Sequence, residues 1–212
     1  RRRHTRFKCD WSSDVCSSDL PEFTRVIRGV HHLVLNTEDM KATIDFYSGV
    51  LGMPLVGAIK VEPGLGTGDD NRGNPPFENL RHYFFDMGND SMLAFFEMPK
   101  GAKKQGDRDD IGMMQHVSFV VSAEMQLAMK ERLIACGYEA NGPVRVSPGS
   151  DSLYFWDPVN DIRLEFSTAP AQGDNQRVIA NRSQTKAMAR KELETLTDDK
   201  AWIERAIQAF KD

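Results

Sequence analysis

The chain has 212 residues, enough for one medium domain or two small modules with a buried core. Hydrophobic residues make up 40% and charged residues 27%, as in ordinary soluble globular proteins, and no apolar stretch approaches the roughly 18 residues of a membrane-spanning helix. The formal net charge of −4, with both signs mixed, argues against a general nucleic-acid binder, which usually presents a basic face.

The N-terminal segment RRRHTRFKCDWSSDVCSSDL does not resemble a folded element or a signal peptide, because it has no apolar core. Residues 9–20 resemble the translation of a common sequencing adapter, so we predict that residues 1–20 are non-native. Without them Cys136 is the single cysteine and has no partner for an internal disulfide. A reducing, cytoplasmic location is therefore expected.

Two segments of the chain repeat one pattern. HLVLNTEDMKATIDFYSGVLGM begins at His32, and HVSFVVSAEMQLAMKERLIACGY begins at His116. Each starts with an alternating apolar run, typical of a strand, and continues with a helical period that ends at Gly52 or Gly137. The predicted buried faces of the two helices are Met40, Ile44, Tyr47 and Leu51 in the first and Met125, Met129, Leu133 and Cys136 in the second.

Three strand-like runs follow each predicted helix. They cover residues 53–61, 81–87 and 91–98 in the first half and residues 138–146, 152–156 and 162–167 in the second. Each half therefore reads βαβββ. This predicts an α+β fold with one module over residues 28–98 and another over residues 113–168.

Two regions lie outside this repeat. Residues 62–80 form a Gly-, Pro-, Asn- and Asp-rich insertion, which indicates a lid, a binding loop or disorder. Residues 169–212 form a tail with a loop and two predicted helices, over residues 183–196 and 198–210. The second helix carries an apolar stripe, expected to pack on the domain or on a second subunit, of Trp202, Ile203, Ala206 and Phe210.

Three polar residues form a candidate metal site. His32 and His116 open equivalent strands of the two repeats, and Glu165 lies in the last strand of the second half. If the halves pair with pseudo-twofold symmetry, both imidazoles can point into one cavity. Two imidazoles and one carboxylate make the facial triad of non-haem Fe(II) oxygenases, so we predict these three residues as metal ligands and expect His31 to point outward or to lie behind the site.

Two motifs frame the repeat. The first is VHHLVL at residues 30–35, with DFY at 45–47 and LGM at 51–53. The second is SLYFWDP at residues 152–158 and RLEF at 163–166. They resemble the opening and closing motifs of the vicinal oxygen chelate superfamily of glyoxalases, bleomycin resistance proteins and extradiol dioxygenases. The second has one extra residue, which a bulge near residues 159–161 is expected to absorb. The resemblance covers roughly residues 28–168 and implies paired βαβββ modules that form a cupped mixed sheet around a divalent metal.

The first functional hypothesis is an extradiol-like dioxygenase that acts on a small chelating aromatic diol with Fe(II). Tyr154 occupies the position where the resemblance implies a substrate-holding tyrosine. His82 is the candidate acid–base residue, because the histidine that the family has near the linker is missing. Arg163 shares the face of Glu165 and could anchor a carboxylate or phosphonate of the substrate.

Two alternatives remain open. One is a lyase, isomerase or transferase of the glyoxalase or fosfomycin-resistance kind, with Mn, Ni or Zn; the other is a metal-free protein that binds a small molecule. A glyoxalase-like site would have a fourth ligand at the position of Ala94, and Glu97 is expected on the opposite face. The expected partner is a small-molecule substrate, without nucleic acid or membrane, and the tail stripe and the resemblance are compatible with a homodimer.

Overall fold

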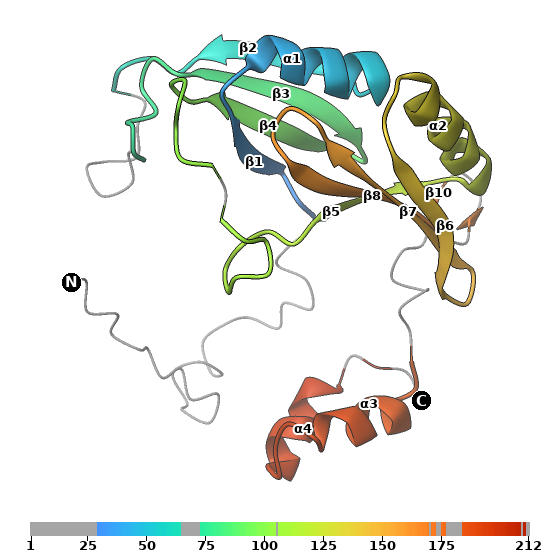
Figure 1. Cartoon of the computed structure of the whole chain (residues 1–212). Coiled ribbons are helices and arrows are strands. Elements are labelled where there is room, and N and C mark those ends of the chain that lie inside the picture. Colours follow the sequence, from blue (N-terminus) through green and yellow to red (C-terminus); the bar gives the residue numbers. More distant parts are fainter. Residues whose placement is uncertain are drawn as a thin grey trace.

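The computed structural model describes residues 29–64, 73–104, 106–169, 184–208 and 210, and the backbone of residues 171–172 and 175–176. Residues 1–20 and the centre of the predicted insertion lie outside the described part of the chain. The body consists of two four-stranded mixed sheets, each accompanied by a helix (Figure 1).

The two sheets have the same topology. The first has the order β1-β4-β3-β2 and is formed by β1 (His32–Thr37), β2 (Leu55–Lys60), β3 (Arg81–Gly88) and β4 (Ser91–Glu97). The second has the order β5-β8-β7-β6 and is formed by β5 (Val117–Val121), β6 (Ala140–Ser147), β7 (Ser150–Asp157) and β8 (Ile162–Thr168). In both, the first strand pairs in parallel with the last, and the other neighbours are antiparallel. The predicted α+β fold of paired βαβββ modules is confirmed.

A helix joins the first two strands of each module. In the first module α1 (Met40–Ile44) continues as a π-helical turn, η1 (Asp45–Val50), and in the second module α2 (Ala123–Ala135) has this place. Asp39 caps α1 and Ser122 caps α2, each by accepting a backbone N–H three residues later. Gly52 and Gly137 follow with φ of 75° and 85°, as the predicted left-handed helix ends require.

The predicted buried face of the first helix is confirmed, and that of the second is partly wrong. Met40 and Tyr47 are buried in the core. On α2, Met129 and Leu133 are buried as predicted, whereas Met125 is 51% exposed and Cys136 is exposed.

Gln126 is buried on α2 in place of Met125. Its amide donates hydrogen bonds of 2.9 and 2.7 Å to the carbonyls of Asp151 and Phe166, which fixes the helix to β7 and β8. Hydrophobic periodicity does not predict a buried glutamine. Here its two hydrogen bonds compensate the cost of removing the amide from water.

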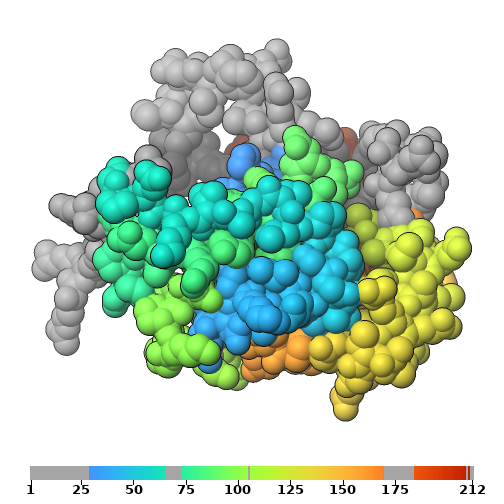
Figure 2. Space-filling model, turned by 90° about the horizontal axis from the view of Figure 1, so that it is seen from above, coloured from blue at the N-terminus to red at the C-terminus, as the bar shows by residue number. Residues whose placement is uncertain are grey.

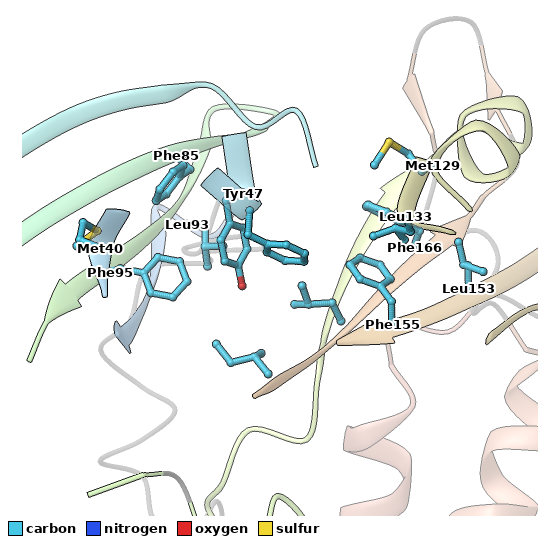
Figure 3. Packing of buried hydrophobic residues seen from close by; sticks show 13 residues of the cluster. Met40, Tyr47, Phe85, Leu93, Phe95, Met129, Leu133, Leu153, Phe155 and Phe166 are labelled. Atoms are coloured by element: carbon cyan, nitrogen blue, oxygen red, sulfur yellow. The ribbon is translucent and has the colours of Figure 1, made fainter. Parts of the chain in front are cut away.

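A buried hydrogen bond joins the two modules. The hydroxyl of Tyr47 donates to Asp157 Oδ2 at 3.0 Å, and neither residue is exposed to solvent. In Figure 3 Tyr47 stands between the core side chains of the first module, such as Phe95, and those of the second, such as Phe155. On the helix-covered side the blue surface of the first module directly adjoins the yellow surface of the second (Figure 2). The core is therefore continuous across the two sheets.

The extra residue of the closing motif is absorbed in a turn, and the predicted bulge is wrong. Asp157 pairs with Ile162, and β7 and β8 remain in regular register. Residues 158–161 form the turn, in which Asp161 has a φ of 57° and Asp157 Oδ1 accepts the N–H groups of Val159 and Asn160. Glu165 thereby keeps the face that the motif requires.

The tail contains β9 (Ala171–Gln172), β10 (Asn175–Gln176) and two helices, α3 (Lys186–Leu193) and α4 (Lys200–Ala206). The helices are shorter than predicted and form a hairpin that Figure 1 shows below the two sheets. Trp202, Ile203 and Phe210 of the predicted stripe pack with Ala189 and Leu193 of α3 in a small core of their own. None of the described helices has the length and apolar character of a bilayer span.

Removing the Tyr47 hydroxyl is expected to destabilise the protein without changing its fold. Tyr47→Phe keeps the ring but deprives the buried Asp157 carboxylate of one donor, which should lower the free energy of unfolding by about 1–3 kcal/mol. Urea denaturation measures this difference. Tyr138→Phe is the matched control, because the Tyr138 hydroxyl has no hydrogen-bond partner among the described residues. Equal losses in the two variants would contradict the role of the hydrogen bond.

Candidate metal centre

Strand register brings three predicted residues to one face of the second sheet. Glu165 lies directly opposite Ser118 of β5 and Tyr154 of β7. The alternate positions on β8, Leu164 and Phe166, are buried in the core on the other face. Side chains at every second position share a face, so His116, two residues before Ser118, points to the same side as Glu165.

His116 and Glu165 are in direct contact. His116 Nε2 lies 2.9 Å from Glu165 Oε2, and the two side chains are 33% and 6% exposed, so the pair can be reached from the side of the imidazole. The other ring nitrogen, Nδ1, forms a hydrogen bond with the side-chain oxygen of Gln115. Because an amide oxygen only accepts, Nδ1 donates in this bond, and Nε2 is the nitrogen that faces the carboxylate.

The opposite side of the Glu165 carboxylate is held by hydroxyl groups. Ser152 and Ser167 both donate to Oε1, the latter at 2.5 Å, and Ser118 donates to Ser167. Burial by itself raises the pKa of Glu165, but these hydrogen bonds and the neighbouring His116 outweigh it, so the pKa lies below its ordinary value. The carboxylate is therefore ionised at neutral pH although it is almost inaccessible.

This pair has the donor chemistry and spacing that suit a cation. His116 Nε2 faces an anionic oxygen at 2.9 Å, a contact that is satisfied by a proton on Nε2 or by a metal ion between the two atoms. Two ligand atoms about 2.1 Å from a shared ion, at right angles, lie about 3 Å apart, close to the 2.9 Å of this pair. The Gln115 contact resembles the partner that commonly orients a metal-bound histidine. Both residues fit a divalent metal.

The third predicted ligand, His32, is not gathered with this pair. No group of three or more His, Cys, Asp or Glu side chains is placed to hold a metal within the part of the chain that the structure describes. The His32 ring is exposed, and its Nδ1 lies 2.7 Å from His31 Nδ1. His31 thus contacts the predicted ligand directly.

The first sheet supplies no carboxylate at the position equivalent to Glu165. Ala94 pairs with Val34, two residues after His32, and Glu165 pairs with Ser118, two residues after His116. Ala94 is therefore the residue of the first module that corresponds to Glu165. Glu97 has a different role: its Oε1 accepts the N–H of Met40 at 3.0 Å, and its Oε2 pairs with Arg81. The carboxylate therefore stabilises the start of α1.

His82 lies beside His32 on the first sheet, within a group of aromatic side chains. Its ring stacks on Phe96 at 3.9 Å between centroids and lies 4.3 Å from Phe84 and 6.4 Å from His32. Phe77 of the insertion stacks on Phe96 at 4.5 Å. Burial, with a smaller effect of His32, lowers the pKa of His82 to about 4, so its imidazole is neutral at pH 7. His82 Nε2 is buried and has no hydrogen-bond partner among the described residues.

Tyr154 and Arg163 lie next to His116. The rings of His116 and Tyr154 are 6.3 Å apart, and the Arg163 guanidinium lies 4.5 Å above the Tyr154 ring. Both therefore border the His116–Glu165 pair.

Comparison with known proteins identifies the family. The family model described as Glyoxalase/Bleomycin resistance protein/Dioxygenase superfamily matches residues 29–171, two thirds of the chain. The chain belongs to this superfamily. No curated protein gives a significant match to it.

Comparison with solved structures gives matches at low sequence identity. The glyoxylase/bleomycin resistance protein/dioxygenase domain from Frankia sp. EAN1pec has a TM-score of 0.51 and 21% identity, and the match covers 68% of this chain and 99% of that one. The glyoxalase family protein from Enterococcus faecalis has a TM-score of 0.49 and 18% identity, and the match covers 68% of this chain and 99% of that one. The genomically encoded fosfomycin resistance protein FosX from Listeria monocytogenes has a TM-score of 0.47 and 17% identity, and the match covers 68% of this chain and 95% of that one.

The sequence did not reveal every group around the centre of this superfamily member. Ser152 and Ser167 face Glu165 at positions that strand alternation could have indicated, once the register was known. Gln115 precedes His116 directly, but nothing in the sequence shows that its side chain turns back to the ring. Arg108, in the segment between β4 and β5, lies over the ring of Trp156, a contact that needs the folded chain.

Lower pH is expected to destabilise the metal-free protein through His82. Between pH 6.5, the ordinary value, and about 4, the unfolded chain binds a proton at this residue that the folded chain excludes, so stability falls as pH falls through this range. His82→Phe keeps an aromatic ring on Phe96 and removes this dependence. The melting temperature, measured from about pH 7 to about pH 4.5, should fall less in the variant than in the wild type. Parallel curves would contradict the burial of a neutral His82.

Proposed function

We propose that this superfamily member is a metal-dependent enzyme in which His116, Glu165 and His32 hold a divalent ion, with ferrous iron as the first candidate. The observation that carries the proposal is the contact of His116 Nε2 with the ionised, buried Glu165. A metal ion between these two atoms would neutralise the buried carboxylate and take Nε2 as its second donor. His32 is proposed as the third ligand because it opens the strand equivalent to that of His116.

The reaction that these residues support best is an extradiol-like oxygenation of a small aromatic diol. Two histidines and one glutamate are typical of Fe(II) oxygenases, in which the ion binds a chelating diol and dioxygen together. Tyr154 lies close enough to His116 to hold a substrate oxygen. His82, a neutral imidazole with a free buried nitrogen beside His32, is the proposed group for moving the diol proton.

A second candidate is a lyase, isomerase or transferase with Mn, Ni or Zn, of the glyoxalase or fosfomycin-resistance kind. One observation favours it: the described residues hold no second histidine on the sheet that carries His116 and Glu165. Acid–base work would then fall to Tyr154, and the Lewis acid would polarise a substrate oxygen without dioxygen.

Metal content of protein purified without oxygen tests the proposal first. We expect about one iron per chain in the wild type and a loss of at least 10-fold in metal affinity in His116→Ala, Glu165→Gln and His32→Ala. His31→Ala is the matched control, since it removes the adjacent imidazole, and should retain the metal. Oxygen uptake with catechols then tests the reaction.

The other outcomes separate the alternatives. Manganese, nickel or zinc lost in the same three variants would replace the dioxygenase by the second candidate. Metal lost in His31→Ala but kept in His32→Ala would exchange the roles of the two neighbours. No metal bound by the wild type, even after reconstitution, would leave a metal-free binding protein.

A further inference from the structure

Two arginines lie over neighbouring aromatic residues of β7. The guanidinium of Arg163 lies 4.5 Å from the centre of the Tyr154 ring, and that of Arg108 lies 5.5 Å from the centre of the Trp156 ring. Tyr154 and Trp156 are two residues apart in one strand and share the face opposite to the buried Phe155. Arg163 also pairs in register with Trp156, so both guanidinium groups occupy one area of the sheet.

Neither of these guanidinium groups has a well-matched anion. Among the described residues Arg163 forms no ion pair, and Arg108 has only its sequence neighbour Asp109 at 3.9 Å. Arg108 Nη1 is buried and has no hydrogen-bond partner among the residues that the structure describes. Other arginines differ: Arg145 pairs with Asp151, and Arg190 pairs with Glu204. A buried donor without an acceptor is unfavourable, and an oxygen of a bound anion would supply the missing acceptor.

This area borders the candidate metal centre. Tyr154 is the ring under Arg163, and the same ring lies 6.3 Å from His116. A molecule chelated at His116 and Glu165 would extend across Tyr154 toward both arginines. Guanidinium groups present planar sets of N–H donors that match the two oxygens of a carboxylate.

We propose that Arg108 and Arg163 together form an oxyanion subsite, so that the substrate carries a carboxylate in addition to its chelating oxygens. The link to chelation rests on the proposed function, whereas the anion site itself depends only on the two arginines. Arg108 is a specificity residue supplied by the segment between β4 and β5, and Trp156 positions it. The substrate class becomes a carboxylated aromatic diol instead of a neutral one.

Binding to the metal-free protein tests the anion site without reference to activity. Calorimetric titrations compare benzoate with benzyl alcohol, which has a similar size and no charge, and phenylphosphonate tests whether a larger oxyanion is accepted. We expect benzoate to bind at least 10-fold more tightly than benzyl alcohol, and Arg108→Met or Arg163→Met to abolish most of this preference. Arg163→Lys should restore part of it if Arg163→Met folds poorly. Arg145→Met is the matched control, because it removes the same charge from a paired arginine on the same sheet.

Each result decides the inference separately from the proposed function. Preference for benzoate that depends on both arginines supports it, even if no metal binds. Phenylphosphonate bound more tightly than benzoate would overturn the choice of a carboxylate. Equal binding of benzoate and benzyl alcohol, or an equal loss in Arg145→Met, would overturn the subsite. In metal-loaded enzyme we compare kcat/KM for 3,4-dihydroxybenzoate with kcat/KM for catechol. The ratio of the two should fall at least 10-fold in Arg108→Met. An unchanged ratio in an active enzyme would overturn the anion subsite but not the proposed reaction.

Discussion

The buried carboxylate of Asp157 is the constraint on which both the fold and the candidate site depend. One of its oxygens organises the turn between β7 and β8, and the other accepts the Tyr47 hydroxyl from the other module. The turn takes up the extra residue of the closing motif, so β8 enters its sheet with Glu165 opposite Ser118 and Tyr154. A single side chain thus links the joining of the modules to the direction in which the candidate ligand points.

Around Glu165 the protein combines two opposed effects. Burial disfavours the ionised form, and the serine hydroxyls on one side restore it, leaving the second oxygen for His116. Paired strands hold these groups, and the Gln115 contact orients the His116 ring so that Nε2 faces the carboxylate. The result is a preorganised pair of donor atoms, one of them anionic, of the kind that divalent ions bind.

The sequence predicted the elements well because strand alternation and helix ends are local properties. The repeat starting at His32 and His116 predicted the order of the elements in both modules, and Gly52 and Gly137 marked the helix ends. It failed on α2, where Gln126 is buried through hydrogen bonds that hydrophobicity does not register. The sequence also predicted Glu165 and His116 in one site, and the two side chains are in contact. It did not predict the roles of Gln115, the serines or Arg108, because these depend on side-chain directions and on loops that only the tertiary structure fixes. The position of His32 as a ligand stays a prediction.

The use of Glu97 at the start of α1 has a consequence for how the two modules diverged. Identical topology in two halves is what duplication of an ancestral module leaves behind. In the second copy the last strand carries Glu165 inside the sheet face, whereas in the first copy Ala94 has that place and the nearest carboxylate is engaged with Met40 and Arg81. The first module has no carboxylate at this position and instead carries an aromatic surface around His82 and Phe96. Substitutions in the aromatic surface of the first module therefore leave the contacts of Glu165 with His116, Ser152 and Ser167 in place, because these groups all belong to the second module.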